Sequence, residues 1–117
     1  MKILIVDDNP GDLKLVEHYL KKAGYDDLLT AATGKEGLTK ARDQHPDIVI
    51  VDTLLPDMNG FEVVKAYKHT NGSKKAIMVT GSIDALDAEK ARLCGADDYV
   101  VKITDMEPVI KAVKKLS

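Results

Sequence analysis

The feature that most constrains the fold is a set of short, unbroken aliphatic runs separated by segments with helical spacing. Strands of a parallel sheet are covered by helices on both faces, so they are continuous apolar runs and do not alternate. Three runs have this character, at residues 3–6, 48–51 and 77–79. We therefore expect five parallel strands, at 2–6, 28–32, 48–52, 76–80 and 99–101.

The segments between these runs predict five helices. Asn9 is suited to an N-cap before Pro10 at the first helical position, and Gly24 is suited to end that helix. Thr33 and Glu36 have the spacing of a capping box, which predicts a helix over 33–44. The remaining helices are expected after residue 60, over 84–94 and from about residue 105.

Strand and helix thus alternate five times, with roughly 23 residues per unit, as in βαβ crossovers. This pattern predicts an α/β fold with a doubly wound, five-stranded parallel sheet. The flavodoxin-like (βα)5 order, 2-1-3-4-5 counted along the chain, is the commonest at this size, and a five-stranded dinucleotide-binding half is the alternative. A chain of 117 residues suits one domain, 1–117.

Composition excludes several classes of protein. The balance of 17 basic against 19 acidic residues argues against direct contact with nucleic acid or a membrane surface, which favours a basic excess. The apolar runs are too short for a membrane span or a signal peptide. The single cysteine excludes an internal disulfide and suits a reducing compartment. We therefore expect a cytoplasmic protein.

Polar side chains end, or directly follow, four of the five expected strands. They are Asp7 and Asp8, Asp52, Thr80 and Lys102. Each alone could be a turn former or a helix cap, but ligands of open α/β sheets bind at these strand ends. Three adjacent carboxylates repel one another, and oxygen-only ligands select Mg²⁺ or Mn²⁺. The ammonium and hydroxyl suit phosphoryl oxygens, so the sequence predicts a phosphoryl-transfer site with an aspartate acceptor.

Nucleotide cofactors do not suit the first loop, which runs from Asp7 to Asp12. It contains neither GxGxxG nor GxxxxGK[ST], and its acidity repels a nucleotide phosphate. We therefore expect no residues that bind a flavin or a nicotinamide cofactor.

The chain resembles the receiver domain of two-component response regulators, in particular the single-domain regulators of chemotaxis. Each matching segment is short, and their order and spacing together are specific to that family. The segments are 3–10, 46–52, 55–63, 79–81, 95–99 and Lys102.

The resemblance implies a role for each residue of the acidic site. Asp52 corresponds to the phospho-acceptor. Asp8 corresponds to a direct ligand of Mg²⁺, with Asp7 assisting through water or orientation. Leu54 corresponds to the position whose backbone carbonyl binds the metal.

The resemblance also implies a switch. Lys102 would pair with the phosphoryl group, and the Thr80 hydroxyl would move toward it. Tyr99 would then rotate inward, while Gly81 keeps the approach to the acceptor open. The surface formed by the helix at 84–94, the strand at 99–101 and the last helix would change shape.

The same resemblance implies the partners. The phosphoryl donor would be a sensor histidine kinase or a histidine phosphotransfer protein, and the switched surface would bind an unidentified downstream protein or a second copy of the chain. The protein would not be an enzyme, apart from catalysing its own phosphorylation and dephosphorylation. If the sequence is complete, its output would pass through a partner.

The sequence departs from the family after the last strand, where Ile103 and Thr104 replace the usual proline and aromatic residue. A cis peptide before a non-proline residue costs about 2.5–4 kcal/mol, so we expect a trans Lys102–Ile103 bond. This departure leaves open a phosphorylation-independent pseudo-receiver. A magnesium phosphatase of the haloacid-dehalogenase type is disfavoured, because its nucleophile follows the first strand in a DxD motif.

Overall fold

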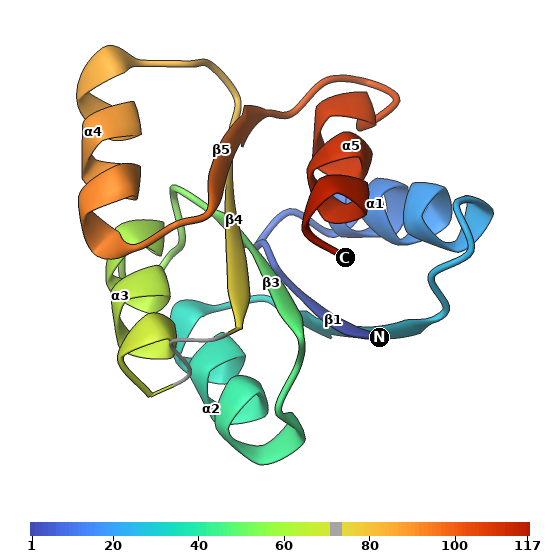
Figure 1. Ribbon diagram of the computed structural model, residues 1–117, viewed down its shortest axis with the longest axis horizontal. Helices are drawn as coiled ribbons and strands as arrows, with labels where there is room; N and C mark the ends of the chain where they lie inside the picture. Colours follow the sequence, from blue (N-terminus) through green and yellow to red (C-terminus); the bar gives the residue numbers. More distant parts are fainter. Residues whose placement is uncertain (71–73) are drawn as a thin grey trace.

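The computed structural model describes residues 1–70 and 74–117 and contains all ten expected elements (Figure 1). The starts of all ten, and the ends expected for the strands and for the first, second and fourth helices, lie within two residues of the expected positions. In chain order they are β1 (Lys2–Val6), α1 (Pro10–Lys22), β2 (Asp27–Ala31), α2 (Gly34–Gln44), β3 (Ile48–Asp52), α3 (Gly60–Thr70), β4 (Lys75–Thr80), α4 (Ala85–Cys94), β5 (Asp98–Val101) and α5 (Glu107–Leu116).

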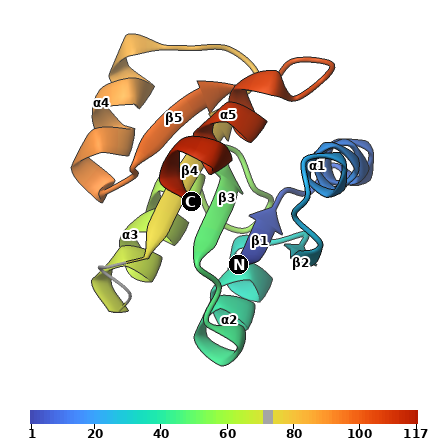
Figure 2. The ribbon, with the colours of Figure 1, turned by 45° about the vertical axis from the view of Figure 1, so that its right-hand side comes forward.

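The five strands form one parallel sheet in the order β2-β1-β3-β4-β5. This confirms the flavodoxin-like fold and excludes the dinucleotide-binding half, whose first two crossovers give a different order. Helices α1 and α5 cover one face, and α2, α3 and α4 cover the other (Figures 1 and 2). In the part of the chain that the structure describes, none of the helices is long and apolar enough to cross a membrane.

The core is divided by the sheet into two layers, because successive side chains of a strand point to opposite faces. In β1, Ile3 and Ile5 pack with α1 and α5, whereas Leu4 and Val6 pack with the helices on the other face. All four side chains are buried. This two-sided burial explains why the strand is an unbroken aliphatic run.

The expected caps are present at the helices that follow β1 and β2. The Asn9 side chain accepts a hydrogen bond from the Asp12 amide at 3.1 Å, and the Thr33 hydroxyl accepts one from the Glu36 amide at 3.0 Å. The Glu36 carboxylate accepts the amide of Ala32, the residue before the N-cap, at 2.7 Å. These caps fix where the first turns begin beside the carboxyl ends of the strands.

The loop from β5 to α5 departs most from a regular connection. The Lys102–Ile103 peptide bond is trans, as expected from Ile103. The N-cap of α5 is Met106, with φ of 54° and no side-chain cap. The Met106 side chain is nevertheless buried in the layer with α1 and α5, so core packing determines this conformation.

Candidate functional site

A hollow of about 690 Å³ opens at the carboxyl ends of the central strands. Its lining includes six of the expected residues: Asp8, Asp52, Leu54, Thr80, Gly81 and Lys102. Asp7 lies beneath it, buried, and contacts Lys102. The structure therefore brings together every expected site residue except Tyr99.

The sheet register explains this convergence. Val6 of β1 pairs with Val51 of β3, so Asp7 and Asp52 come next on adjacent strands. On the other side of β3, Asp52 is level with Val79 of β4, so Thr80 lies one residue beyond. Parallel pairing thus places the chemistry at one edge of the sheet, although its residues lie far apart in sequence.

The start of α3 depends on a glycine beneath the site. A Cβ atom at Gly60 would overlap the backbone carbonyl oxygen of Asp52, and the Gly60 amide donates to the Thr53 carbonyl at 3.0 Å. Only a residue without a side chain allows the helix to approach the end of β3 so closely. This contact holds the loop that follows Asp52 in place.

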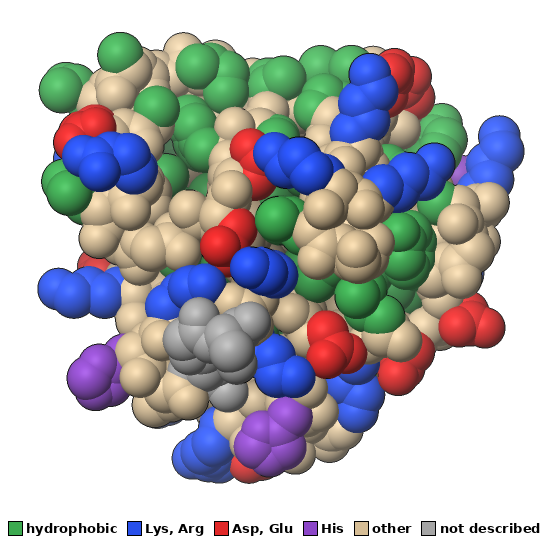
Figure 3. Space-filling model, viewed as in Figure 1, with side chains coloured by type: hydrophobic (Ala, Val, Ile, Leu, Met, Phe, Trp, Pro, Cys, Tyr) green, Lys and Arg blue, Asp and Glu red, His purple; other side chains and the backbone are tan. Residues whose placement is uncertain are grey.

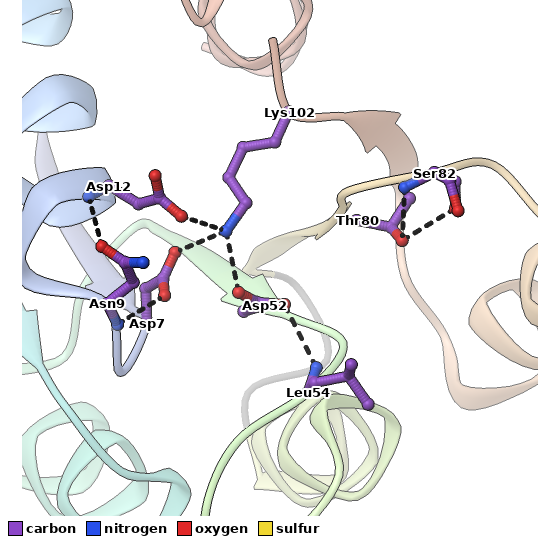
Figure 4. Close-up of polar contacts among 8 residues, drawn as sticks. All are labelled: Asp7, Asn9, Asp12, Asp52, Leu54, Thr80, Ser82 and Lys102. Carbon is purple, nitrogen blue, oxygen red and sulfur yellow. Dashed lines mark hydrogen bonds and ion pairs between the residues drawn. The ribbon is translucent and has the colours of Figure 1, made fainter. Parts of the chain in front are cut away.

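The Lys102 ammonium lies at the centre of the site (Figure 4). Its Nζ atom contacts carboxylate oxygens of Asp7 at 3.0 Å, Asp12 at 2.7 Å and Asp52 at 2.9 Å. Burial lowers the pKa of Lys102, but the hydrogen bonds that its ammonium donates to the three carboxylates outweigh this effect, and the pKa is raised overall. Lys102 is therefore firmly charged and directed at the expected phospho-acceptor.

Three carboxylates could hold a metal ion. Ligand atoms of Asp7, Asp8 and Asp52 all lie within 4.8 Å of one another. The pKa of Asp7 is raised, chiefly by burial and further by the charge of Asp52, although the Asn9 amide and Lys102 oppose the shift. An all-oxygen set with this excess of negative charge fits a hard cation such as Mg²⁺.

Leu54 adds a backbone contact on the far side of Asp52. Its amide donates to Asp52 Oδ1 at 3.1 Å, so the two carboxylate oxygens are held by different groups. The Leu54 side chain is 78% exposed. The binding of a metal by its backbone carbonyl remains a prediction.

The Thr80 hydroxyl is buried and turned away from Asp52. It donates to the backbone carbonyl of Ser82 at 2.9 Å and accepts the Ser82 amide at 3.3 Å (Figure 4). Gly81 next to it is exposed, and an added Cβ would contact nothing within 4 Å, so the mouth of the hollow is open there. Thr80 is thus close to the site, but its hydroxyl is hydrogen-bonded to the β4–α4 loop.

Tyr99 lies on edge strand β5, outside the residues that line the hollow. Its ring packs against the core layer shared by α3 and α4. The hydroxyl oxygen is buried and has no hydrogen-bond partner among residues 1–70 and 74–117. Its role in switching stays a prediction.

Sequence reasoning missed Asp12. It lies in the first turn of α1, and its contact with Lys102 is the shortest of the three. The available indication was positional, because a helix that starts where β1 ends presents its first turn to the same edge of the sheet. An acid in a first turn is common for another reason, its interaction with the helix dipole, so composition alone did not distinguish it.

Comparison with known proteins assigns the family. The family model for the response regulator receiver domain matches residues 3–114. The chain belongs to this family. It is therefore a signalling module of two-component systems, and the fold and the acidic cluster are those that the sequence predicted.

Individual relatives show how far the similarity extends. The receiver domain is 34% identical to the alkaline phosphatase synthesis transcriptional regulatory protein PhoP of Bacillus subtilis, over 98% of this chain and 48% of that protein. It is 31% identical to protein PilG of Pseudomonas aeruginosa, over 97% of this chain and 85% of PilG. The receiver therefore spans about half the length of PhoP and most of PilG.

Solved structures agree with the fold along the whole receiver. Chemotaxis protein CheY4 of Vibrio cholerae has a TM-score of 0.90 at 32% identity, covering 99% of this chain and 98% of CheY4. The response regulator TrrA of Thermotoga maritima, in complex with Mg²⁺ and BeF, has a TM-score of 0.90 at 33% identity, covering all of both chains. The TrrA complex carries the kind of ion that suits the acidic cluster here.

Proposed function

We propose that the chain, as a single receiver domain over 1–117, accepts a phosphoryl group on Asp52 in a magnesium-dependent phosphorelay. The observation that carries this proposal is the contact of the Lys102 ammonium with Asp52 at 2.9 Å, next to the carboxylates of Asp7 and Asp8. The acceptor lies at the floor of an open hollow that a phosphorylated partner can reach.

The donor is a phosphohistidine on a sensor histidine kinase or a histidine phosphotransfer protein. A carboxylate oxygen of Asp52 attacks phosphorus, the P–O bond forms as the P–N bond breaks, and the imidazole nitrogen leaves with the electron pair and takes a proton. Asp7, Asp8, Asp52 and the Leu54 carbonyl would hold Mg²⁺, or Mn²⁺ in its place, and the ion would supply positive charge to the phosphoryl oxygens. Lys102 stabilises the same negative charge with a directed ammonium.

Switching follows from the contacts of the resting site. The Thr80 hydroxyl gives up its hydrogen bond to Ser82 and forms one with the phosphoryl group. This movement pulls the β4–α4 loop toward Asp52. Tyr99 then moves inward, and Gly81 leaves room for the phosphoryl oxygens. The chain acts only on itself, through its own phosphorylation and dephosphorylation.

We propose that α4, β5 and α5 form the surface that binds the downstream partner. The receiver is proposed to act in the cytoplasm. Apolar side chains are exposed over α4 (Figure 3), where Leu86 is 74% and Leu93 70% exposed. Exposed leucines on a helix suit a protein partner, either an unidentified target or a second copy of the chain. We propose that the receiver contacts protein here and does not itself bind nucleic acid or a membrane.

A phosphorylation assay tests the proposal. The chain is incubated with acetyl phosphate and Mg²⁺, and intact mass is measured with and without a chelator. We expect a mass increase of one phosphoryl group that requires Mg²⁺ and is absent in Asp52→Asn. Asp26→Asn, which removes an exposed acid remote from the site, is the matched control.

The outcome that contradicts the proposal is equally clear. If acetyl phosphate with Mg²⁺ does not phosphorylate the folded wild-type chain and beryllofluoride with Mg²⁺ does not bind it, the protein is a phosphorylation-independent pseudo-receiver. Turnover of many phosphomonoester molecules per chain would instead indicate a phosphatase of the haloacid-dehalogenase type.

A further inference from the structure

The Lys102 ammonium has three N–H donors, and all three are occupied. They meet oxygens of Asp7, Asp12 and Asp52 at 3.0, 2.7 and 2.9 Å. A phosphoryl oxygen that binds Lys102 must therefore take a donor from one of these carboxylates. Which carboxylate yields determines how easily the site accepts a phosphoryl group.

Two of the three carboxylates are held by the main chain. Asp7 accepts the Asn9 amide at 3.0 Å, and Asp52 accepts the Leu54 amide at 3.1 Å. In the described part of the chain, the Asp12 carboxylate has no hydrogen bond other than the one from Lys102. The Asp12 side chain is also the most exposed, at 29% against 6% for Asp7 and 12% for Asp52.

Asp12 has space into which it can withdraw. Besides lining the hollow above Asp52, it lines a neighbouring hollow of about 520 Å³ with Leu15 and Ile103. Asp12 is also absent from the group of carboxylates whose ligand atoms converge within 4.8 Å. Its contact is thus with the ammonium and separate from the proposed metal ligands.

We propose that Asp12 is a positioning residue that holds Lys102 in the resting site and competes with the incoming phosphoryl group for its ammonium. This inference rests on the proposed function and adds regulation to it. Asp12 keeps one donor occupied and places a negative charge at the mouth of the hollow. It therefore slows phosphorylation by small anionic donors, and the phosphoryl group takes up the donor when Asp12 withdraws.

The test compares Asp12→Asn with wild type. Rate constants for phosphorylation by acetyl phosphate are measured at saturating Mg²⁺, together with the dissociation constants of Mg²⁺ alone and of beryllofluoride at saturating Mg²⁺. Removing one unit charge near the reacting group is expected to raise the rate constant about three- to tenfold and to tighten beryllofluoride binding by a similar factor. The Mg²⁺ dissociation constant should change about twofold or less, and the gain in rate should shrink as salt is added.

Two further variants isolate the effect of the carboxylate. Asp12→Glu restores a carboxylate and should restore the slow rate of phosphorylation. Such a rescue would not be expected if Asp12→Asn acted only by removing a structural contact. Asp87→Asn removes an acid from the first turn of α4 and should leave the rate unchanged, so it controls for the loss of charge at a helix start.

Each other outcome overturns the proposal. If Asp12→Asn is phosphorylated at the wild-type rate or more slowly, Asp12 does not compete with the phosphoryl group. If its Mg²⁺ dissociation constant rises tenfold, Asp12 acts as a metal ligand. Failure of the wild-type chain to accept a phosphoryl group from any donor would overturn the proposed function itself, which is a different result.

Discussion

Charged side chains are arranged in opposite ways at the two ends of the sheet. At the amino end, Asp47 accepts the Lys2 amide at 2.8 Å and pairs with Lys74 at 3.1 Å. Asp97 accepts the Ala76 amide at 2.9 Å and pairs with Lys68 at 3.0 Å. At the carboxyl end, Asp7, Asp12 and Asp52 all contact the Lys102 ammonium, and Asp8 lies beside Asp7 and Asp52.

This difference separates charges that support the fold from charges that await a ligand. Each acid at the amino end has one cation and one backbone donor, so its negative charge is compensated. The carboxyl end carries an excess of negative charge that no group of the described chain neutralises. We expect such a site to be destabilising when empty, and the proposed cation and phosphoryl group would relieve the repulsion.

The largest effect is expected at the compensated end. Asp97→Ala leaves the Lys68 ammonium, whose side chain is 16% exposed, without its counterion and leaves the Ala76 amide unpaired. We expect the free energy of unfolding to fall by about 3 kcal/mol, measured by urea denaturation. Asp26→Ala, at an exposed position, should change it by less than about 0.5 kcal/mol. A loss as small as that of the control would mean that the amino-end pair does not support the fold.

Binding of a divalent cation at the carboxyl end of the sheet should raise the free energy of unfolding nearly as much as Asp97→Ala lowers it. The proposed Mg²⁺ site exists in the native acidic cluster and not in the unfolded chain, so Mg²⁺ at a hundred times its dissociation constant should add about 2.7 kcal/mol to the free energy of unfolding. Chelation should remove this gain. Thermal melts with and without Mg²⁺ measure it in wild type, Asp97→Asn and Asp8→Asn. The gain should persist in the first variant and be lost in the second. An equal gain in both variants would place the cation elsewhere.

When Mg²⁺ is absent, Asp8→Asn should raise the free energy of unfolding, whereas Asp97→Ala lowers it. Asp8 is exposed and makes no hydrogen bond in the described part of the chain, so the substitution removes repulsion from Asp7 and Asp52 without removing a contact. We expect a gain of about 1 kcal/mol in the free energy of unfolding, measured with a chelator present. Destabilisation of similar size would show that the carboxyl end is already balanced without a ligand.

The sequence was sufficient to predict the position of the site, because strand ends determine it. Once the aliphatic runs predict parallel strands, Asp7, Asp52, Thr80 and Lys102 must lie at one edge of the sheet. The pairing register of the strands then determines which of these residues are neighbours, so the position of the site can be predicted without side-chain geometry. The trans peptide at Ile103 followed from an equally local argument, whereas the strand order was expected only because it is the commonest at this chain length, with a dinucleotide-binding half as the alternative.

What the sequence could not predict depends on packing between distant segments. The direction of the Thr80 hydroxyl is set by the path of the β4–α4 loop, and the contact of Asp12 with Lys102 joins α1 to the end of β5. Met106 takes a left-handed conformation because its side chain fills the core, although the pattern predicted a helix beginning near residue 105. Local propensity does not contain these contacts.

The smallest expected effect is a pH dependence at the amino end. The Lys2 amide, and then the Lys74 ammonium, hold the pKa of Asp47 below its ordinary value of about 4. Because the folded-state pKa is depressed, the carboxylate stabilises the fold above about pH 4 and loses that contribution as the pH falls through the folded value. Asp47→Asn should therefore lower the free energy of unfolding by a few tenths of a kcal/mol at pH 7, since the side chain is 42% exposed and screened. In urea denaturation from pH 7 to pH 3, the difference from wild type should begin to shrink below about pH 4 and keep shrinking as the pH falls toward the lower folded-state value. Asp26→Asn is the exposed control. A difference that stayed constant over this range would mean that hydrogen bonding to Asp47 does not depend on its charge, and the two ends of the sheet would then differ less than their ion pairs indicate.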